Sequence, residues 1–144
     1  MVNTHEKKSP LEVSYVIPGD PVPLARARMH RDRIYDPQKH LKLSAGLYLL
    51  NQHGSLPFFT GPLELSIIFY IAASKKHSPG KYHIFRPDLS NLIKFIEDIA
   101  TGILYHDDCL ISSLTAIKKY DTLPRTELTV KEIHGNKAVQ SRKS

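Results

Sequence analysis

The chain has 144 residues, 41% of them hydrophobic, which is enough for one domain with its own core. Its formal net charge of +6 favours an anionic partner, such as nucleic acid or an anionic membrane surface. No apolar run approaches the ~18 residues that span a membrane, and the N-terminus lacks the apolar segment of a secretory signal. Because Cys109 is the single cysteine, an internal disulfide is excluded, and we expect a cytoplasmic protein.

The chain begins with a polar stretch, residues 1–10, that we expect to be flexible. Residues 11–17 alternate apolar and polar side chains and predict a strand. Residues 26–33 then carry a dense set of arginines: Arg26, Arg28, Arg31 and Arg33. This stretch is either a solvated loop or an arm that binds DNA phosphates. We favour the arm, because guanidinium groups bind phosphate oxygens at two points.

The middle of the chain predicts a helix followed by a strand. Residues 37–52 predict a helix that begins with proline, and four apolar side chains are in helical phase: Leu41, Ala45, Tyr48 and Leu49. His40 and His53 are expected on the surface. Residues 63–72 are almost continuously apolar, which predicts a strand in the middle of a sheet.

A second basic segment, residues 73–86, follows this strand and contains Lys75, Lys76 and Arg86. A Ser-Pro-Gly sequence predicts a turn within it. The segment is either a solvated loop or a second contact with DNA. We favour the contact, because the segment leads directly to Asp88.

The stretch 86–108 has the strongest functional pattern. Asp88 is a good helix N-cap, and Gly102 marks the end of the helix. Apolar side chains at helical spacing predict one buried face: Leu89, Leu92, Ile93, Ile96, Ile99 and Ala100. The opposite face is polar: Ser90, Asn91, Lys94, Glu97 and Asp98. Two acids, Asp107 and Asp108, follow the helix.

Two further strands are predicted over residues 109–120 and 126–133, and the basic residues 134–144 are expected to form a flexible tail. The chain has no internal repeat and no linker, so residues 11–133 are predicted to form a single domain. The order strand, helix, strand, helix, strand, strand predicts an α+β fold. In this two-layer sandwich, two helices cover one face of a mixed four-stranded sheet.

The acids of the 86–108 stretch suit a hard divalent cation. The carboxylates of Asp88, Asp107 and Asp108 favour Mg²⁺ or Mn²⁺, and the sequence has no Cys/His spacing for zinc. A bound Mg²⁺ would make a hydroxide nucleophile available, and Lys94 would stabilise the charge that develops on phosphorus. The simpler alternative is that Asp88 only caps the helix and that the two later acids only form a turn.

The chain resembles the RusA family of Holliday junction resolvases in one long motif, Arg86-Pro87-Asp88-Leu89-Ser90-Asn91-Leu92-Ile93-Lys94, which is followed by Gly102 and the acid pair. The earlier segment Gly19-Asp20-Pro21-Val22-Pro23 and the arginines after it resemble phage-type members. Residues 124–130 resemble the last strand of the family. The resemblance therefore extends over residues 11–133.

The resemblance implies a homodimeric, Mg²⁺-dependent endodeoxyribonuclease that cuts four-way DNA junctions in DNA recombination and repair. By position, Asp88 and Asp108 would be catalytic, metal-binding acids and Lys94 the catalytic lysine. Asp107 would be their acidic neighbour, and Asn91 follows the family pattern. A symmetric dimer suits two matched incisions in a junction of nearly twofold symmetry.

One position departs from the family, because Ser90 stands where the family has a second acid. Asp107 or Asp98 would then supply the missing carboxylate, and Glu97 is a poor substitute because it lies roughly 10 Å along the helix from Ser90. Alternatively, the site binds metal more weakly and favours Mn²⁺. A third account is a protein that binds junctions without cutting them. We favour the nuclease over this non-catalytic junction-binding protein.

Overall fold

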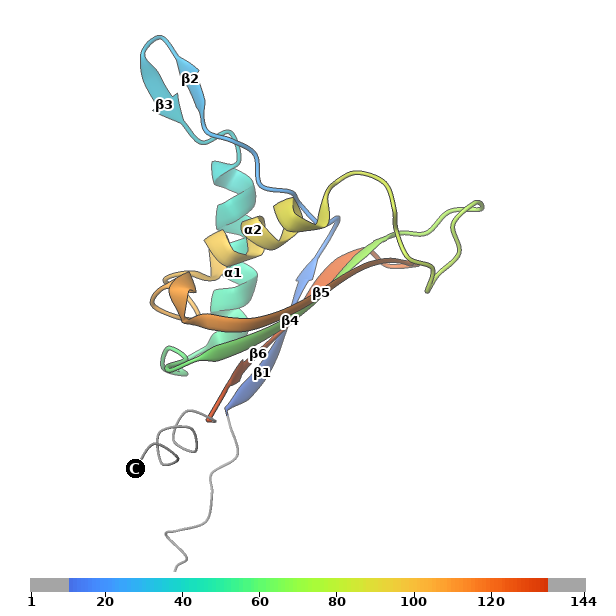
Figure 1. The fold of residues 1–144 in the computed structure, drawn as a ribbon. Helices are drawn as coiled ribbons and strands as arrows, with labels where there is room; N and C mark the ends of the chain where they lie inside the picture. The colour runs from blue at the N-terminus through green and yellow to red at the C-terminus, as the bar shows by residue number, and fades with distance from the viewer. Residues whose placement is uncertain (1–10, 135–144) are drawn as a thin grey trace, which may run out of the picture.

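Four strands form the central sheet of the computed structural model, which describes residues 11–134 (Figure 1). They are β1 (Glu12–Pro18), β4 (Leu63–Ala72), β5 (Ile111–Asp121) and β6 (Arg125–Glu132). Their spatial order is β1-β6-β4-β5; β4 and β5 are parallel, and the other neighbours are antiparallel. This arrangement confirms the predicted mixed sheet.

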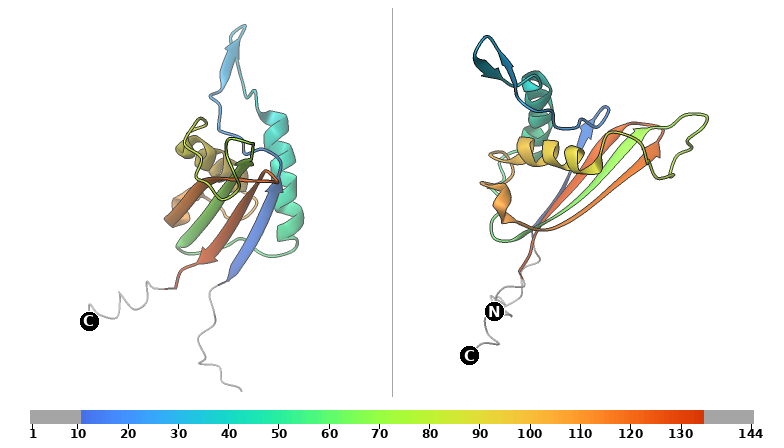
Figure 2. Two further views of the ribbon diagram at one scale, coloured as in Figure 1. Left: turned by 90° about the vertical axis from the view of Figure 1, so that its right-hand side faces the viewer. Right: turned by 45° about the horizontal axis from the view of Figure 1, so that its top comes forward.

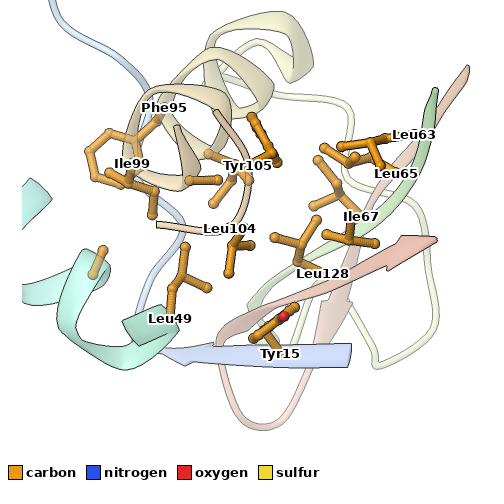
Figure 3. Packing of buried hydrophobic residues seen from close by; sticks show 14 of the residues in the cluster. Tyr15, Leu49, Leu63, Leu65, Ile67, Phe95, Ile99, Leu104, Tyr105 and Leu128 are labelled. Carbon is orange, nitrogen blue, oxygen red and sulfur yellow. The ribbon is translucent and has the colours of Figure 1, made fainter. Parts of the chain in front are cut away.

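Two helices, α1 (Lys39–His53) and α2 (Leu89–Ala100), cover one face of this sheet, which confirms the α+β fold (Figures 1 and 2). The hydrophobic core lies between the layers. Figure 3 shows Phe95 and Ile99 of α2 on one side of this core, with Leu63 and Ile67 of β4 on the other. Each fully buried side chain of this kind stabilises the fold by about 1.5–3 kcal/mol relative to an exposed one.

The central strand β4 explains how α2 is positioned. Its inward side chains alternate along the strand and are fully or almost fully buried: Leu63, Leu65, Ile67 and Phe69. Because β4 pairs in parallel with β5, the chain must cross over the sheet between them, and α2 forms most of the regular part of this crossover. The polar face of α2 therefore faces solvent. The segment after α2 brings the chain back to the end of the sheet at which β4 begins, so that β5 runs parallel to β4.

A separate two-stranded hairpin, β2 (Arg28–His30) and β3 (Arg33–Tyr35), projects away from the sheet beyond α1 (Figures 1 and 2). Its two turn residues, Arg31 and Asp32, have positive φ angles of 50° and 64°. This backbone geometry matches the twist of antiparallel strands in tight hairpins. The predicted basic loop is therefore a defined hairpin.

Two predicted boundaries differ from the structure. Cys109 lies in a short 3-10 helix, η1 (Asp108–Leu110), so β5 begins at Ile111 and not at residue 109. The first helix begins at Lys39 and not at residue 37. Gln38 is the N-cap residue of α1 but makes no cap hydrogen bond with its side chain. Its side-chain amide instead bonds the backbone of Pro23 and Ala25.

The predicted core face of α1 is only half correct. Ala45 and Leu49 are buried, whereas Leu41 and Tyr48 are 50% and 42% exposed. The helix carries apolar side chains on nearly all sides, so hydrophobic spacing alone could not select the buried face.

His53 is also placed differently from the prediction, because it is 4% exposed and not on the surface. Its Nδ1 lies 2.7 Å from the hydroxyl of Tyr15, and its Nε2 lies 2.9 Å from the carbonyl oxygen of Pro57. Since the carbonyl only accepts, we assign the proton to Nε2, and the Tyr15 hydroxyl donates to Nδ1. Burial raises the pKa of Tyr15 to about 12, which keeps this donor protonated.

No helix within residues 11–134 is long and apolar enough to cross a membrane. The expected flexible N-terminus, residues 1–10, lies outside the described residues, as does the expected basic tail apart from its first residue.

Candidate active site

A polar pocket of about 350 Å³ opens along the C-terminal half of α2. Four of its lining residues recur at helical spacing, so they share one face of α2: Lys94, Glu97, Asp98 and Thr101. Leu24, from the segment before the hairpin, and Asp108, at the start of η1, complete the lining. The pocket is therefore built from α2, the segment that follows it and the distant segment at Leu24, and it contains one lysine and three acids.

The two acids after α2 have different environments. Asp107 is the N-cap of η1, and its Oδ1 accepts a hydrogen bond from the Cys109 backbone N–H at 2.9 Å. This bond holds the pKa of Asp107 below its usual value. Asp108 instead lines the pocket with Lys94. Of the predicted acid pair, Asp108 therefore lines the pocket, and Asp107 caps η1.

Glu97 is the acid that sequence reasoning set aside, and the structure places it in the pocket with Asp108. Partial burial, and then the negative charge of Asp108, raise the pKa of Glu97, while Lys94 opposes the rise. Along the helix, Glu97 lies roughly 10 Å from Ser90, which is why it is a poor substitute for an acid at that position. The relevant neighbour is Asp108, which reaches Glu97 only because the chain reverses after α2. The helical spacing of Lys94 and Glu97 was the one available signal.

A buried hydroxyl lies beside these acids. Tyr105 is fully buried, and its hydroxyl has no hydrogen-bond partner among the described residues. Burial and the negative charges of Glu97 and Asp108 raise its pKa, so it stays protonated. The hydroxyl of Thr101 donates to the Glu97 carbonyl oxygen at 2.8 Å.

Asp98, another candidate for the missing carboxylate, is already paired. Its Oδ2 lies 2.9 Å from Nζ of Lys42 on α1, and Lys42 also forms an ion pair with Asp36 at the base of the hairpin. These two acids raise the pKa of Lys42. Asp98 therefore links α2 to α1, which leaves Glu97 as the acid with fewer competing partners.

Asp88 lies at the opposite end of α2 from this pocket. It is the N-cap residue of α2, but its side chain makes no cap hydrogen bond. Nine residues separate it from Glu97, about 13 Å along the helix axis. Because the side chain makes no cap hydrogen bond, the simple cap interpretation does not account for the Asp88 carboxylate.

The two other motif residues lie in the first turn of α2. Ser90 shares the polar face with Lys94. The carbonyl of Asn91 accepts a hydrogen bond from the Leu24 N–H at 2.9 Å.

The segment that leads to Asp88 is fixed from the sheet. Nζ of Lys118 on β5 donates to the carbonyl oxygens of Phe85 and Pro87, at 2.8 Å each. The backbone N–H of His83 donates to the Lys118 carbonyl at 3.1 Å. Lys118 was not identified from the sequence, because nothing in a strand pattern indicates which loop its side chain will reach.

The chemistry of the pocket fits a divalent cation in part. Carboxylate oxygens of Asp108 and Glu97 are suitable ligands for Mg²⁺ or Mn²⁺. Within residues 11–134, however, no three His, Cys, Asp or Glu side chains are close enough to hold an ion together. The structure therefore does not bring Asp88, Asp107 and Asp108 into one ligand set. Mg²⁺ often uses only one or two carboxylates, with waters and a substrate phosphate completing its shell.

The predicted DNA-binding residues form two separate exposed groups: Arg26, Arg28, Arg31 and Arg33 on or beside the hairpin, and Lys75, Lys76 and Arg86 in the segment after β4. In Figures 1 and 2, α2 lies between the hairpin and this segment. A nucleic acid that contacted both groups would therefore pass along α2.

Comparison with known proteins identifies the family of the chain. The sequence profile of the family Endodeoxyribonuclease RusA matches residues 18–131. The chain is 37% identical over 73 residues to the "Crossover junction endodeoxyribonuclease rusA" of Lactococcus phage r1t, covering 50% of this chain and 56% of that protein. It is 24% identical over 137 residues to the "Uncharacterized protein YqaN" of Bacillus subtilis strain 168, covering 84% of this chain and 96% of that protein. The match to the phage protein thus spans little more than half of its length.

Proposed function

The chain belongs to the RusA family of endodeoxyribonucleases, and we propose on this basis that it cuts four-way (Holliday) DNA junctions by metal-dependent hydrolysis. The observation that carries the proposal is the single pocket in which Lys94, Glu97 and Asp108 meet. Leu24 of the pocket leads into the arginine-rich hairpin, whose charge suits the phosphate backbone of DNA. Acids that bind a metal and a nearby lysine suit phosphodiester cleavage.

The residues of the pocket have distinct proposed roles. Asp108 and Glu97 would hold Mg²⁺ or Mn²⁺, which when bound would polarise a phosphoryl oxygen and lower the pKa of a water molecule. The ammonium group of Lys94 would stabilise the negative charge that develops on the phosphoryl oxygens during attack. Asp88 remains a predicted metal-binding acid from the family resemblance, and Asp107 supports η1. Ser90 supplies no charge to this site.

We also propose a homodimer that acts in DNA recombination and repair in the cytoplasm. The support for the dimer is a row of exposed leucines along α1: Leu43, Leu47 and Leu50. They are 57%, 56% and 49% exposed, and their spacing places them on one side of the helix. An exposed apolar stripe of this kind is typical of an interface, and a second copy of the chain would give two active sites for two incisions.

Incubation with labelled DNA tests the function directly. Purified protein would be mixed with a four-way junction, a linear duplex or a single strand, in Mg²⁺, Mn²⁺ or EDTA. We expect paired nicks in the junction alone, only with metal. A junction that is retarded in a gel but stays intact in every metal would instead identify the non-catalytic junction-binding protein that the loss of an acid at Ser90 suggests.

Alanine at the four hairpin arginines, Arg26, Arg28, Arg31 and Arg33, should weaken binding to all DNA forms. Each lost phosphate contact should lower the slope of log affinity against log salt by about 0.9. The measurement is a fluorescence-anisotropy titration at several salt concentrations, with circular dichroism to confirm the fold. An unchanged slope in a folded variant would show that the hairpin arginines do not contact DNA.

Replacing Leu43 and Leu47 with glutamate should convert the dimer to a monomer, because two buried charges at an isologous interface meet their own copies. Sedimentation velocity would give the mass of each form. The matched control is Leu56→Glu, since Leu56 is 42% exposed but lies outside α1. A wild-type chain that sediments as a monomer would contradict the proposed dimer.

A further inference from the structure

The β2–β3 hairpin has two chemically different faces. Met29 and Ile34 are cross-strand partners, so their side chains lie on the same face of the hairpin. They are 69% and 74% exposed. The neighbouring pairs, Arg28 with Tyr35 and His30 with Arg33, present their side chains to the other face. The hairpin thus carries an apolar pair on one side and cationic groups on the other.

We propose that Met29 and Ile34 form an apolar wedge that contacts unstacked bases at the branch point of a DNA junction, an inference that rests on the proposed function. Proteins that deform DNA insert Met, Ile, Leu or Phe side chains between base steps, and unstacking those bases costs free energy. At a branch point the continuous stack of the duplex is already interrupted, so this cost is lowest there. The wedge would therefore favour branched over linear DNA.

The charge around the apolar pair selects nucleic acid as its partner. Residues 26–33 contain four arginines and one histidine but a single acid, Asp32. A second copy of this hairpin at the same face would bring four more arginines, and the like charges would repel. DNA offers phosphates for the arginines and base faces for the apolar pair at the same place.

The base of the hairpin is attached to the pocket at two points. On one side, Leu24 lines the pocket, and its N–H bonds the Asn91 carbonyl of α2 at 2.9 Å. On the other side, Asp36 shares Lys42 with Asp98, which also lines the pocket.

The two sides are joined across the base by the Gln38 amide. Its Oε1 accepts from the Ala25 N–H at 2.9 Å, and its Nε2 donates to the Pro23 carbonyl at 2.7 Å. Because Gln38 is buried, this clamp is shielded from water. A hairpin fixed in this way can set a distance within the bound DNA. This is the distance from the branch point, held at Met29 and Ile34, to the phosphate that enters the pocket.

The test uses a four-way junction with 2-aminopurine at the branch point and a linear duplex with the same label and flanking sequence. Ca²⁺ would replace Mg²⁺, so that binding is measured without turnover. We expect wild-type protein to raise the fluorescence of the junction several-fold and that of the duplex little. The Met29→Ser, Ile34→Ser double variant should bind with an unchanged salt slope but lose most of this increase. Met29→Leu with Ile34→Val should restore it.

The control is Leu123→Ser, because Leu123 is 66% exposed but lies in the turn between β5 and β6. It should retain the wild-type increase. Equal fluorescence from wild-type and double-serine protein would overturn the wedge. A lower sedimentation mass for the double-serine variant would also overturn it, because the two side chains would then hold two copies of the chain together. A wild-type protein that cuts junctions without raising fluorescence would overturn the wedge alone. One that neither binds nor cuts a junction would overturn the proposed function as well.

Discussion

Asp108→Asn should reduce junction cleavage by at least about 100-fold while leaving junction affinity nearly unchanged. The substitution keeps the shape of the side chain but removes a negative charge from the pocket with Lys94 and Glu97. A bound metal contributes several kcal/mol to transition-state stabilisation, and about 2.7 kcal/mol corresponds to 100-fold in rate. The hairpin arginines, which should supply most of the affinity, are untouched. Single-turnover cleavage and gel retardation in Ca²⁺ would measure the two quantities separately.

Asp107→Asn is the matched control, since it changes the same residue type one position earlier. Asp107 is used to cap η1, so this variant should lose some thermal stability and keep its cleavage rate. If Asp107→Asn abolishes cleavage and Asp108→Asn does not, Asp107 and not Asp108 is the metal-binding acid. If Asp108→Asn cuts at the wild-type rate, the pocket is not the active site.

Glu97→Gln should raise the Mg²⁺ concentration for half-maximal cleavage by about 10-fold or more, because it removes one of two proposed metal ligands. Adding Ser90→Asp in the same chain should not recover the loss, because residue 90 lies roughly 10 Å along the helix from Glu97. The fold should tolerate this change, since an acid near the N-terminus of a helix is favoured by its dipole. In wild-type protein, Ser90→Asp should leave activity level or lower it by adding like charge.

Two measurements distinguish this account from its alternatives. The first is the cleavage rate against Mg²⁺ concentration for wild type, both single variants and the double variant. The second is Mn²⁺ binding to the protein without DNA, by electron paramagnetic resonance. Asp98→Asn is the matched control, because Asp98 is paired with Lys42 and should not change metal affinity. If Ser90→Asp alone strongly increases cleavage in Mg²⁺, the site is instead a weakened version of the family's.

Local patterns were sufficient for the elements whose burial follows from their own composition. The continuous apolar character of β4 predicted its central place, because only a strand with two neighbours and a covered face buries such a run. The 3.6-residue period of α2 likewise predicted its buried face, where Leu92 and Ile96 are almost fully covered. In these elements each residue's environment is set by residues within a few positions along the chain.

Patterns were not sufficient where several parts of the chain decide the outcome. The helix α1 is apolar on most sides, so its buried face depends on where β1 and α2 lie. His53 is polar and near a helix end, yet it is buried because Tyr15 and Pro57 supply partners for both of its ring nitrogens. The basic residues before α1 predicted a charged arm, but its opposed apolar and cationic faces depend on the strand register.

The candidate site shows the same division. Local patterns were enough to predict the family motif, the residue types of the chemistry and the helix that carries Lys94. Three other features depend on how separate segments pack: Asp108 and not Asp107 enters the pocket, Lys42 holds Asp98, and Glu97 lies with Asp108. They could not be predicted because Coulomb interactions and metal ligation depend on distances through space. The parallel crossover from β4 to β5 sets those distances, and no local pattern contains them.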